Sequence, residues 1–240
     1  MNAQHLDLLH HNIWFAQLEV HFQDFIIQHG KIKQMDKHQT AFHSGDVFDG
    51  IYAVLEGSIC LGYIDLHGKE AVSAIIEPIM WFGEISLVDH QPRSHDAIAL
   101  QKSVLLHLPS TAMMLLLERY PAFWFHIAQL TTQKLRHAFL ELISIQTQSL
   151  QQRLAQRLLF ILNGYGNHQH IQNMNIQLSQ EQMAQMLMSS RQTIHQELHQ
   201  LEHLGIVRLG FKHIEVVDLP KLTLLASGKN SENKTIKKLN

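Results

Sequence analysis

The chain has 240 residues, a formal net charge of −2 and 45% hydrophobic residues, which suits one or two folded domains and argues against a disordered protein. No run approaches the roughly 18 apolar residues of a membrane-spanning helix, and we expect no secretory signal because the first residues lack a basic start followed by an apolar core. The single cysteine, Cys60, excludes an internal disulfide and a four-cysteine iron–sulfur site, so we expect a cytoplasmic protein.

Charge is unevenly distributed along the chain. Residues 1–150 carry 9 Lys/Arg against 15 Asp/Glu, whereas residues 151–240 carry 10 against 6. A basic C-terminal part after an acidic N-terminal part is typical of a separate nucleic-acid-binding module. Several of the C-terminal lysines belong to the last fifteen residues, so this indication is weak by itself.

Residues from about 40 to 110 form short segments separated by turn glycines. Three segments are rich in β-branched or aromatic residues: Ile51–Leu55, Ser58–Ile64 and Ala71–Ile76. The glycines that punctuate this region are Gly45, Gly50, Gly57 and Gly68, and His67-Gly68 predicts a hairpin tip. The pattern predicts an all-β unit, a small barrel or roll.

A long helix is predicted after Pro121, because neither proline nor glycine recurs until Gly164. An apolar or small-residue stripe follows it at heptad spacing, namely Ala128, Thr131, Leu135, Ala138, Leu142, Ile145 and Ser149. Such a stripe fits a self-associating helix, and it equally fits an amphipathic helix packed on its own domain. The pattern alone leaves both interpretations open.

The C-terminal third resumes an apolar helical pattern at Arg153–Asn163 and then passes through a polar loop, Asn167–Asn175. Two short helices and a hairpin follow and end near Leu225. Residues 226–240 are rich in Lys, Asn and Ser, and we expect them to be disordered.

The two short helices carry clear start signals. Ser179 and Gln182 have the spacing of a capping box, and Ser189-Ser190 can cap a second helix from Arg191 to about Leu204. The residues expected on its inward face are Ile194, Leu198, Leu201 and Leu204; those expected outward are Arg191, Gln192, His195, Gln196 and His199. Gly205 suits a helix C-cap, and a hairpin around residues 210–213 can serve as a wing.

The outward face has the donors that read duplex DNA. Arg191 can make a bidentate contact to guanine, and Gln192 or Gln196 to adenine. His195 and the cap-region serines, Ser179 and Ser190, are better placed for phosphates. The alternative is a structural helical hairpin whose outer face is merely solvated.

At this point a family resemblance emerges. Ser190-Arg-Gln-Thr-Ile194, followed by Leu198 and Gly205-Ile206, resembles the recognition helix and wing entry of Crp/Fnr-family regulators. The resemblance implies that Arg191, Gln192 and Gln196 face bases. Glutamine replaces the Glu and Arg of a cyclic-AMP-responsive member, so the preferred half-site should differ.

A second motif lies about a hundred residues earlier, in Trp81–Leu87 and Gln91–His95. The carboxylate of Glu84 can accept hydrogen bonds from sugar hydroxyls, while Arg93 and Ser94 can hold a phosphate. The segment resembles the phosphate-binding cassette of cyclic-nucleotide-binding domains, and with the C-terminal motif the resemblance covers about residues 14–220. The alternative is a retained scaffold in which Glu84 and Arg93 pair with each other.

The resemblance implies an α+β protein: a β-roll (jelly roll) at 14–120, a dimerisation helix at 121–149 and a winged helix-turn-helix at 150–225. It implies an effector, cyclic AMP or cyclic GMP, bound by Gly83, Glu84, Ile85, Arg93 and Ser94; beside these, the ring of Phe139 could stack on the base. The chain departs from the family at Ala138 and Phe139, where cyclic-AMP-binding members place hydroxyl side chains, and at Ile79, which replaces a glycine.

The expected function is therefore a homodimeric, effector-controlled transcription regulator, not an enzyme. Its expected partners are pseudo-palindromic double-stranded DNA and RNA polymerase. Two alternatives stay open: a nucleotide-binding protein that has lost DNA binding, and a regulator with a haem or metal effector. The residues for the latter would be the i, i+4, i+8 set His195, His199 and His203 for zinc, and His126 or His137 for haem.

Overall fold

The computed structural model describes residues 1–64, 70–164, 174–176, 178–211 and 213–228. The chain forms two compact units, Met1–His137 with Gly164–Gln169, and Ala138–Asn163 with His170–Asn240. We describe each unit by itself. No helix in the described ranges is long and apolar enough to cross a membrane.

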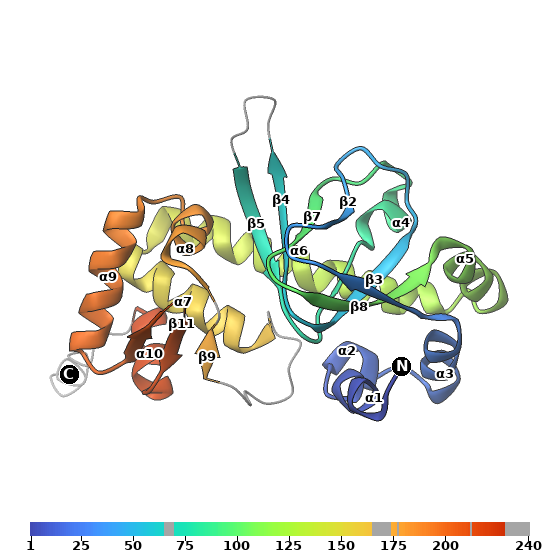
Figure 1. The fold of residues 1–240 in the computed structure, drawn as a ribbon, viewed down its shortest axis with the longest axis horizontal. Helices are drawn as coiled ribbons and strands as arrows, with labels where there is room; N and C mark the ends of the chain where they lie inside the picture. The colour runs from blue at the N-terminus through green and yellow to red at the C-terminus, as the bar shows by residue number, and fades with distance from the viewer. Residues whose placement is uncertain (65–69, 165–173, 177, 212, 229–240) are drawn as a thin grey trace, which may run out of the picture. The chain divides into compact units, whose positions relative to one another are not determined.

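Three helices precede the first strand: α1 (Ala3–His10), α2 (Ile13–Ala16) and α3 (Val20–His29) (Figure 1). Asn12 holds them to the body of the unit because its fully buried side chain caps α2 and donates to the Ile79 carbonyl at 2.9 Å. Aromatic residues of these helices, including Trp14, Phe15 and Phe22, join the core with Trp81. Sequence reasoning did not anticipate α1, which lies before residue 14.

The first unit is built on two four-stranded antiparallel sheets, ordered β1-β8-β3-β6 and β2-β7-β4-β5. Its strands are β1 (Lys31–Met35), β2 (Thr40–Phe42), β3 (Gly50–Glu56), β4 (Ile59–Ile64), β5 (Glu70–Ile76), β6 (Trp81–Phe82), β7 (Asp96–Ala99) and β8 (Ser103–Pro109). The predicted strand 51–55 lies within β3 and 71–76 within β5, whereas Ser58 lies just before β4. The predicted hairpin tip, His67-Gly68, is outside the described residues.

Strand β3 is buried on both faces, and its alternation divides the core. Tyr52 and Val54 point between the two sheets, while Ile51, Ala53 and Leu55 pack with the helices on the other side. A strand alternates its side chains with a period of two, so one strand serves both layers. The predicted β-roll is confirmed.

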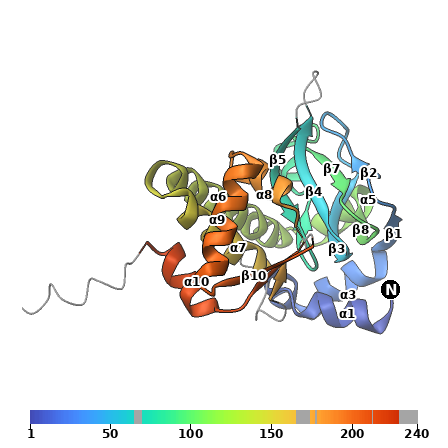
Figure 2. The same ribbon diagram turned by 60° about the vertical axis from the view of Figure 1, so that its left-hand side comes forward.

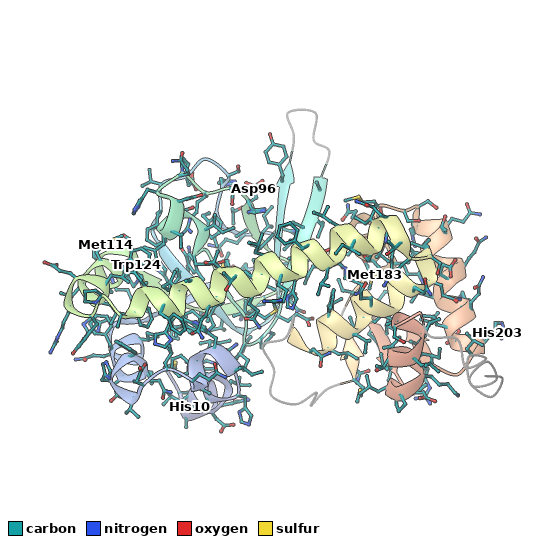
Figure 3. The ribbon with its side chains drawn as sticks, turned by 180° about the vertical axis from the view of Figure 1, so that it is seen from behind. His10, Asp96, Met114, Trp124, Met183 and His203 are labelled. Carbon is teal, nitrogen blue, oxygen red and sulfur yellow. The ribbon has the colours of Figure 1, made fainter. Side chains whose placement is uncertain are left out.

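Helices α5 (Ser110–Arg119) and α6 (Phe123–Thr147) follow the roll, and α6 is the long helix seen in Figure 3. Its N-terminal half buries Phe123, Ile127 and Leu130 in the first unit. Leu135 and Leu142 of the predicted heptad stripe are instead 52% and 54% exposed. The interpretation of that stripe as packed on its own domain is therefore wrong.

The second unit continues with α7 (Leu150–Leu162), β9 (Asn175–Ile176), α8 (Gln180–Met186), α9 (Arg191–His203), β10 (Val207–Gly210), β11 (His213–Val216) and α10 (Leu219–Ala226) (Figure 2). Ser149 caps α7, so the helix predicted for 121–149 ends before that residue. The three strands pair in the order β10-β11-β9. Helix α10 extends one residue into the predicted tail, and residues 229–240 lie outside the described residues.

Candidate effector pocket and DNA-binding surface

The cassette motif runs from β6 through a glycine turn into a short helix, α4 (Ile85–Asp89). Gly83 has φ +94°, and a Cβ there would lie 3.0 Å from Nη1 of Arg93. Both the left-handed backbone and the close approach favour glycine. The turn places Glu84 at the start of α4 with only 1% of its surface exposed.

Arg93 is buried, and both terminal nitrogens of its guanidinium have hydrogen-bond partners. Nη1 donates to the Gly83 carbonyl and Nη2 to the Gly50 carbonyl, each at 2.6 Å, and Nη2 also pairs with the carboxylate of Asp49. The guanidinium stacks 4.2 Å from the ring centre of Phe42. Its Nε is buried and has no hydrogen-bond partner among the described residues. The alternative in which Glu84 pairs with Arg93 is wrong, because Asp49 is the partner of Arg93.

Asp49 is the acidic centre of this network, and sequence reasoning missed it. Burial alone would raise the pKa of its carboxyl, but the hydrogen bond from Tyr52 and the charge of Arg93 lower it overall. Burial and the bond to Asp49 in turn raise the pKa of Tyr52. Both shifts favour an ionised Asp49 and a neutral Tyr52. The only sequence signal was an acid directly before the turn residue Gly50.

The two carboxylate oxygens of Glu84 differ in their partners. Its Oε2 lies 2.6 Å from Nζ of Lys134 on α6, and its Oε1 is buried with no hydrogen-bond partner in the part of the chain that the structure describes. A buried acceptor without a donor costs free energy until a donor arrives. A ligand hydroxyl would supply that donor, and sequence reasoning missed Lys134 as the neighbour.

The remaining predicted effector residues are less enclosed. Ser94 is exposed, with its Oγ 2.7 Å from Nδ1 of His95, and Ile85 is 38% exposed at the first position of α4. Phe139 is 56% exposed and belongs to the second unit, so its stacking on an effector base stays a prediction.

In the second unit both helix caps form as predicted. The Ser179 hydroxyl accepts from Gln182 N at 3.2 Å, and Gln182 Oε1 accepts from Ser179 N at 3.0 Å. The Ser190 hydroxyl accepts from Thr193 N at 3.0 Å. A cap fixes where each helix begins, which aligns the first turn of α9.

Helix α9 has the predicted division into two faces. Ile194, Leu198 and Leu201 are buried, whereas the side chains of Arg191, Gln192, His195, Gln196 and His199 are exposed. Leu204 contradicts the prediction: it is 54% exposed because α9 ends at His203 and the chain turns at Gly205, φ +68°, which brings Ile206 into the core instead.

A pocket of about 400 Å³ opens beside the start of α9. It is lined by residues of the α8 N-terminus, the first residue of α9 and the hairpin, namely Leu178, Ser179, Gln180, Glu181, Arg191, Leu209, Gly210, Phe211, His213 and Ile214. Oε1 of Gln180 also lies 3.2 Å from Nδ1 of His195. The first turn of α9 therefore borders a groove of mixed polar and apolar lining next to the wing.

Two of the histidines considered for metal or haem, His199 and His126, contact carboxylate or amide side chains. No group of three or more His, Cys, Asp or Glu side chains within the described ranges could hold a metal ion. His199 contacts Glu202, Nδ1 to Oε2, at 3.1 Å. Nε2 of His126 lies 3.1 Å from Oε2 of Glu19, and its Nδ1 lies 3.2 Å from Oε1 of Gln129.

Two family models match the chain in the order of its two units. The cyclic nucleotide-binding domain matches residues 25–120, and the Crp-like helix-turn-helix domain matches residues 152–225. The cyclic AMP receptor protein of Thermus thermophilus is 32% identical over 188 residues, covering 78% of this chain and 84% of the relative. The chain belongs to the Crp/Fnr family of transcription regulators.

Other members of the Crp/Fnr family are similar at lower identity. A CRP-like cAMP-activated global transcriptional regulator of Mycobacterium tuberculosis is 24% identical over 184 residues, covering 76% of this chain and 82% of the relative. The solved structure of FixK2 from Bradyrhizobium japonicum has a TM-score of 0.71 at 17% identity, covering 82% of this chain and 96% of that chain. The FixK2 likeness concerns the fold alone.

Proposed function

We propose that this Crp/Fnr-family regulator reads its DNA site with Arg191, Gln192 and Gln196. The exposed first turns of α9, held by the Ser190 cap, support this assignment most directly. A recognition helix contacts base edges with its N-terminal residues. Arg191 offers a bidentate contact to guanine, and each glutamine offers one to adenine. His195, Ser179 and Ser190 would contact phosphates, with both serines also serving as helix caps.

The effector of the proposed regulator is a cyclic nucleotide, cyclic AMP or cyclic GMP. The buried Oε1 of Glu84 is an unused acceptor suited to a ribose hydroxyl, and the buried Nε of Arg93 is an unused donor suited to a phosphate. Gly83, Ile85 and the exposed Ser94 complete the cassette. Similar chains carry the names cyclic AMP receptor protein and cAMP-activated regulator, which agrees with this choice.

The proposed active form is a homodimer joined through α6. Leu135, Phe139 and Leu142 succeed one another at spacings of four and three residues and are each more than half exposed. Two copies can bury such a stripe against each other. A dimer carries two recognition helices and would read a pseudo-palindrome with half-sites about 34 Å apart. Such a protein acts as a regulator and not as an enzyme. RNA polymerase is the further partner through which it would act.

Selection from a pool of random duplexes tests the proposal. Full-length protein at moderate salt should enrich a two-fold symmetric motif, and cyclic AMP or cyclic GMP should sharpen the enrichment. The Arg93→Ala variant should lose the response to nucleotide while retaining basal DNA binding. Absence of any enriched motif, together with tight nucleotide binding in calorimetry, would favour a nucleotide-binding protein that no longer reads DNA.

A further inference from the structure

His95 directly follows the two residues proposed to hold the effector phosphate. In the chain it lies between Arg93-Ser94 and strand β7, whose first residue, Asp96, is labelled in Figure 3. Its Nδ1 is 2.7 Å from the Ser94 hydroxyl oxygen. The family resemblance assigned no role to this side chain, although it contacts one of the assigned residues.

The charges around His95 come from three elements. Glu84 at the start of α4 and Asp96 favour its protonated form, whereas Lys134 on α6 opposes it. Burial is the largest influence and lowers the pKa of His95 below its usual value. The neutral form of His95 is therefore favoured at physiological pH.

Two further histidines lie close to acidic residues of this region. Nδ1 of His43 lies 3.3 Å from Oδ1 of Asp96, and Nε2 of His107 lies 3.8 Å from Oδ2 of Asp49. His107 has its pKa lowered by burial. Among the described residues, the histidine whose ring nitrogen lies within hydrogen-bond distance of the Ser94 hydroxyl is His95.

The direction of the Ser94–His95 hydrogen bond decides what the hydroxyl can offer a ligand. When Nδ1 of His95 is unprotonated, the Ser94 hydroxyl donates its one hydrogen to that nitrogen. When His95 is protonated, Nδ1 donates to the Ser94 oxygen instead. The hydroxyl hydrogen is then free to donate to a phosphate oxygen, and the imidazolium adds a positive charge beside it.

We propose that His95 is an effector-binding residue whose protonation releases the Ser94 hydroxyl for the effector phosphate, so that effector binding takes up a proton. The inference rests on the proposed cyclic-nucleotide effector. It adds a specificity-determining residue to the cassette, since a neutral ligand would gain nothing from the imidazolium. A monoanionic cyclic phosphodiester gains both a hydrogen bond and a charge pair.

The negative charge of the phosphodiester determines whether effector affinity rises or falls with pH. A phosphodiester beside His95 favours its charged form and raises its pKa in the complex. Affinity should therefore increase as pH falls through the pKa of the complex, and level off below the lower pKa of the free protein. For a rise of about one unit on binding, the total gain in affinity from high to low pH is at most about tenfold.

Calorimetry of full-length protein with cyclic AMP and with cyclic GMP, at pH 6, 7 and 8, tests the inference. Repeating the pH 7 titration in buffers of different ionisation heat measures proton uptake directly. The variant is His95→Gln, which keeps a polar side chain that does not titrate. The matched control is His90→Asn, an exposed histidine in left-handed backbone that asparagine tolerates.

Wild type and His90→Asn should bind more tightly at pH 6 than at pH 8, by at most about tenfold, and should take up a fraction of a proton. His95→Gln should bind equally at both pH values with no uptake. An unchanged pH dependence in His95→Gln, with nucleotide binding intact, overturns the role of His95 and leaves the effector proposal standing. Absence of binding of either nucleotide at every pH overturns both.

Discussion

Nζ of Lys134 lies 2.6 Å from Oε2 of Glu84, so one ion pair joins the long helix α6 to the first turn of the cassette. Glu84 is 1% exposed and Lys134 30% exposed on their side chains. Removing one partner of a buried ion pair leaves the other charge uncompensated, which is costly. The same pair connects the proposed ligand acceptor to the helix that carries the exposed Leu135–Leu142 stripe.

Lys134→Met should therefore destabilise the first unit by about 1–3 kcal/mol, less than for a fully buried pair because Lys134 is partly exposed. Urea denaturation followed by tryptophan fluorescence measures this loss selectively, since the three tryptophans, Trp14, Trp81 and Trp124, all lie in that unit. Lys102→Met, at an exposed lysine, is the control. Adding Glu84→Gln should restore most of the loss. Strictly additive losses in the double variant would show that the two side chains do not stabilise each other.

Arg191→Ala should relax base preference at one position of each half-site and cost about 1–3 kcal/mol on the preferred duplex. The physical reason is that guanidinium donors discriminate guanine from the other bases. Competition binding against duplexes substituted at single positions measures it. Arg208→Ala is the comparison, because Arg208 lies on the wing strand β10 and pairs with Glu215 at 2.6 Å. An equal loss on every sequence for Arg191→Ala would assign that residue to phosphate.

Local patterns in the sequence predicted the helix caps and the buried face of the helix-turn-helix region. The capping box of Ser179 and Gln182 and the buried stripe of Ile194, Leu198 and Leu201 depend on residues three or four positions apart. Leu204 broke the pattern because helix termination at His203, not periodicity, decided its exposure. The shift of one residue at a helix end is enough to turn a side chain outward.

The surroundings of the cassette residues Glu84 and Arg93 were harder to predict because their contacts join distant parts of the chain. Arg93 and Asp49 are 44 residues apart, and Lys134 and Glu84 are 50 residues apart. The sequence motif indicated which side chains belong to the cassette, but not that Asp49 and Lys134 would already pair with them. Sheet register and the path of α6 bring those partners together, and neither has a short-range signal.

Glu77 gives the first unit a pH-dependent stability. Burial raises the pKa of its carboxyl from 4.5 to about 7. Because the folded state holds the proton more tightly than the unfolded state, the associated stability is fully present below pH 4.5 and is lost as pH rises towards and through 7. Glu77→Gln removes the ionisable group and should stabilise the unit at pH 8, by about 1–3 kcal/mol, with little effect at pH 4.5.

Urea denaturation at pH 4.5, 6 and 8, again followed by tryptophan fluorescence, compares Glu77→Gln with wild type. Asp89→Asn, at an exposed carboxylate of α4, is the matched control and should leave the pH profile unchanged. Parallel profiles for wild type and Glu77→Gln would show that Glu77 titrates normally in the folded protein.

Leu142→Glu should dissociate the dimer. Leu142 is 54% exposed on α6, and in a two-fold symmetric interface each substitution places a charge close to its own copy. We expect the dimer dissociation constant to rise at least about 100-fold, measured by sedimentation velocity, with an unchanged helical circular dichroism spectrum. Leu140→Glu is the matched control, because Leu140 is 41% exposed and lies about 100° round the helix from Phe139. A dimer that survives Leu142→Glu but dissociates with Leu140→Glu would move the interface to another face of α6.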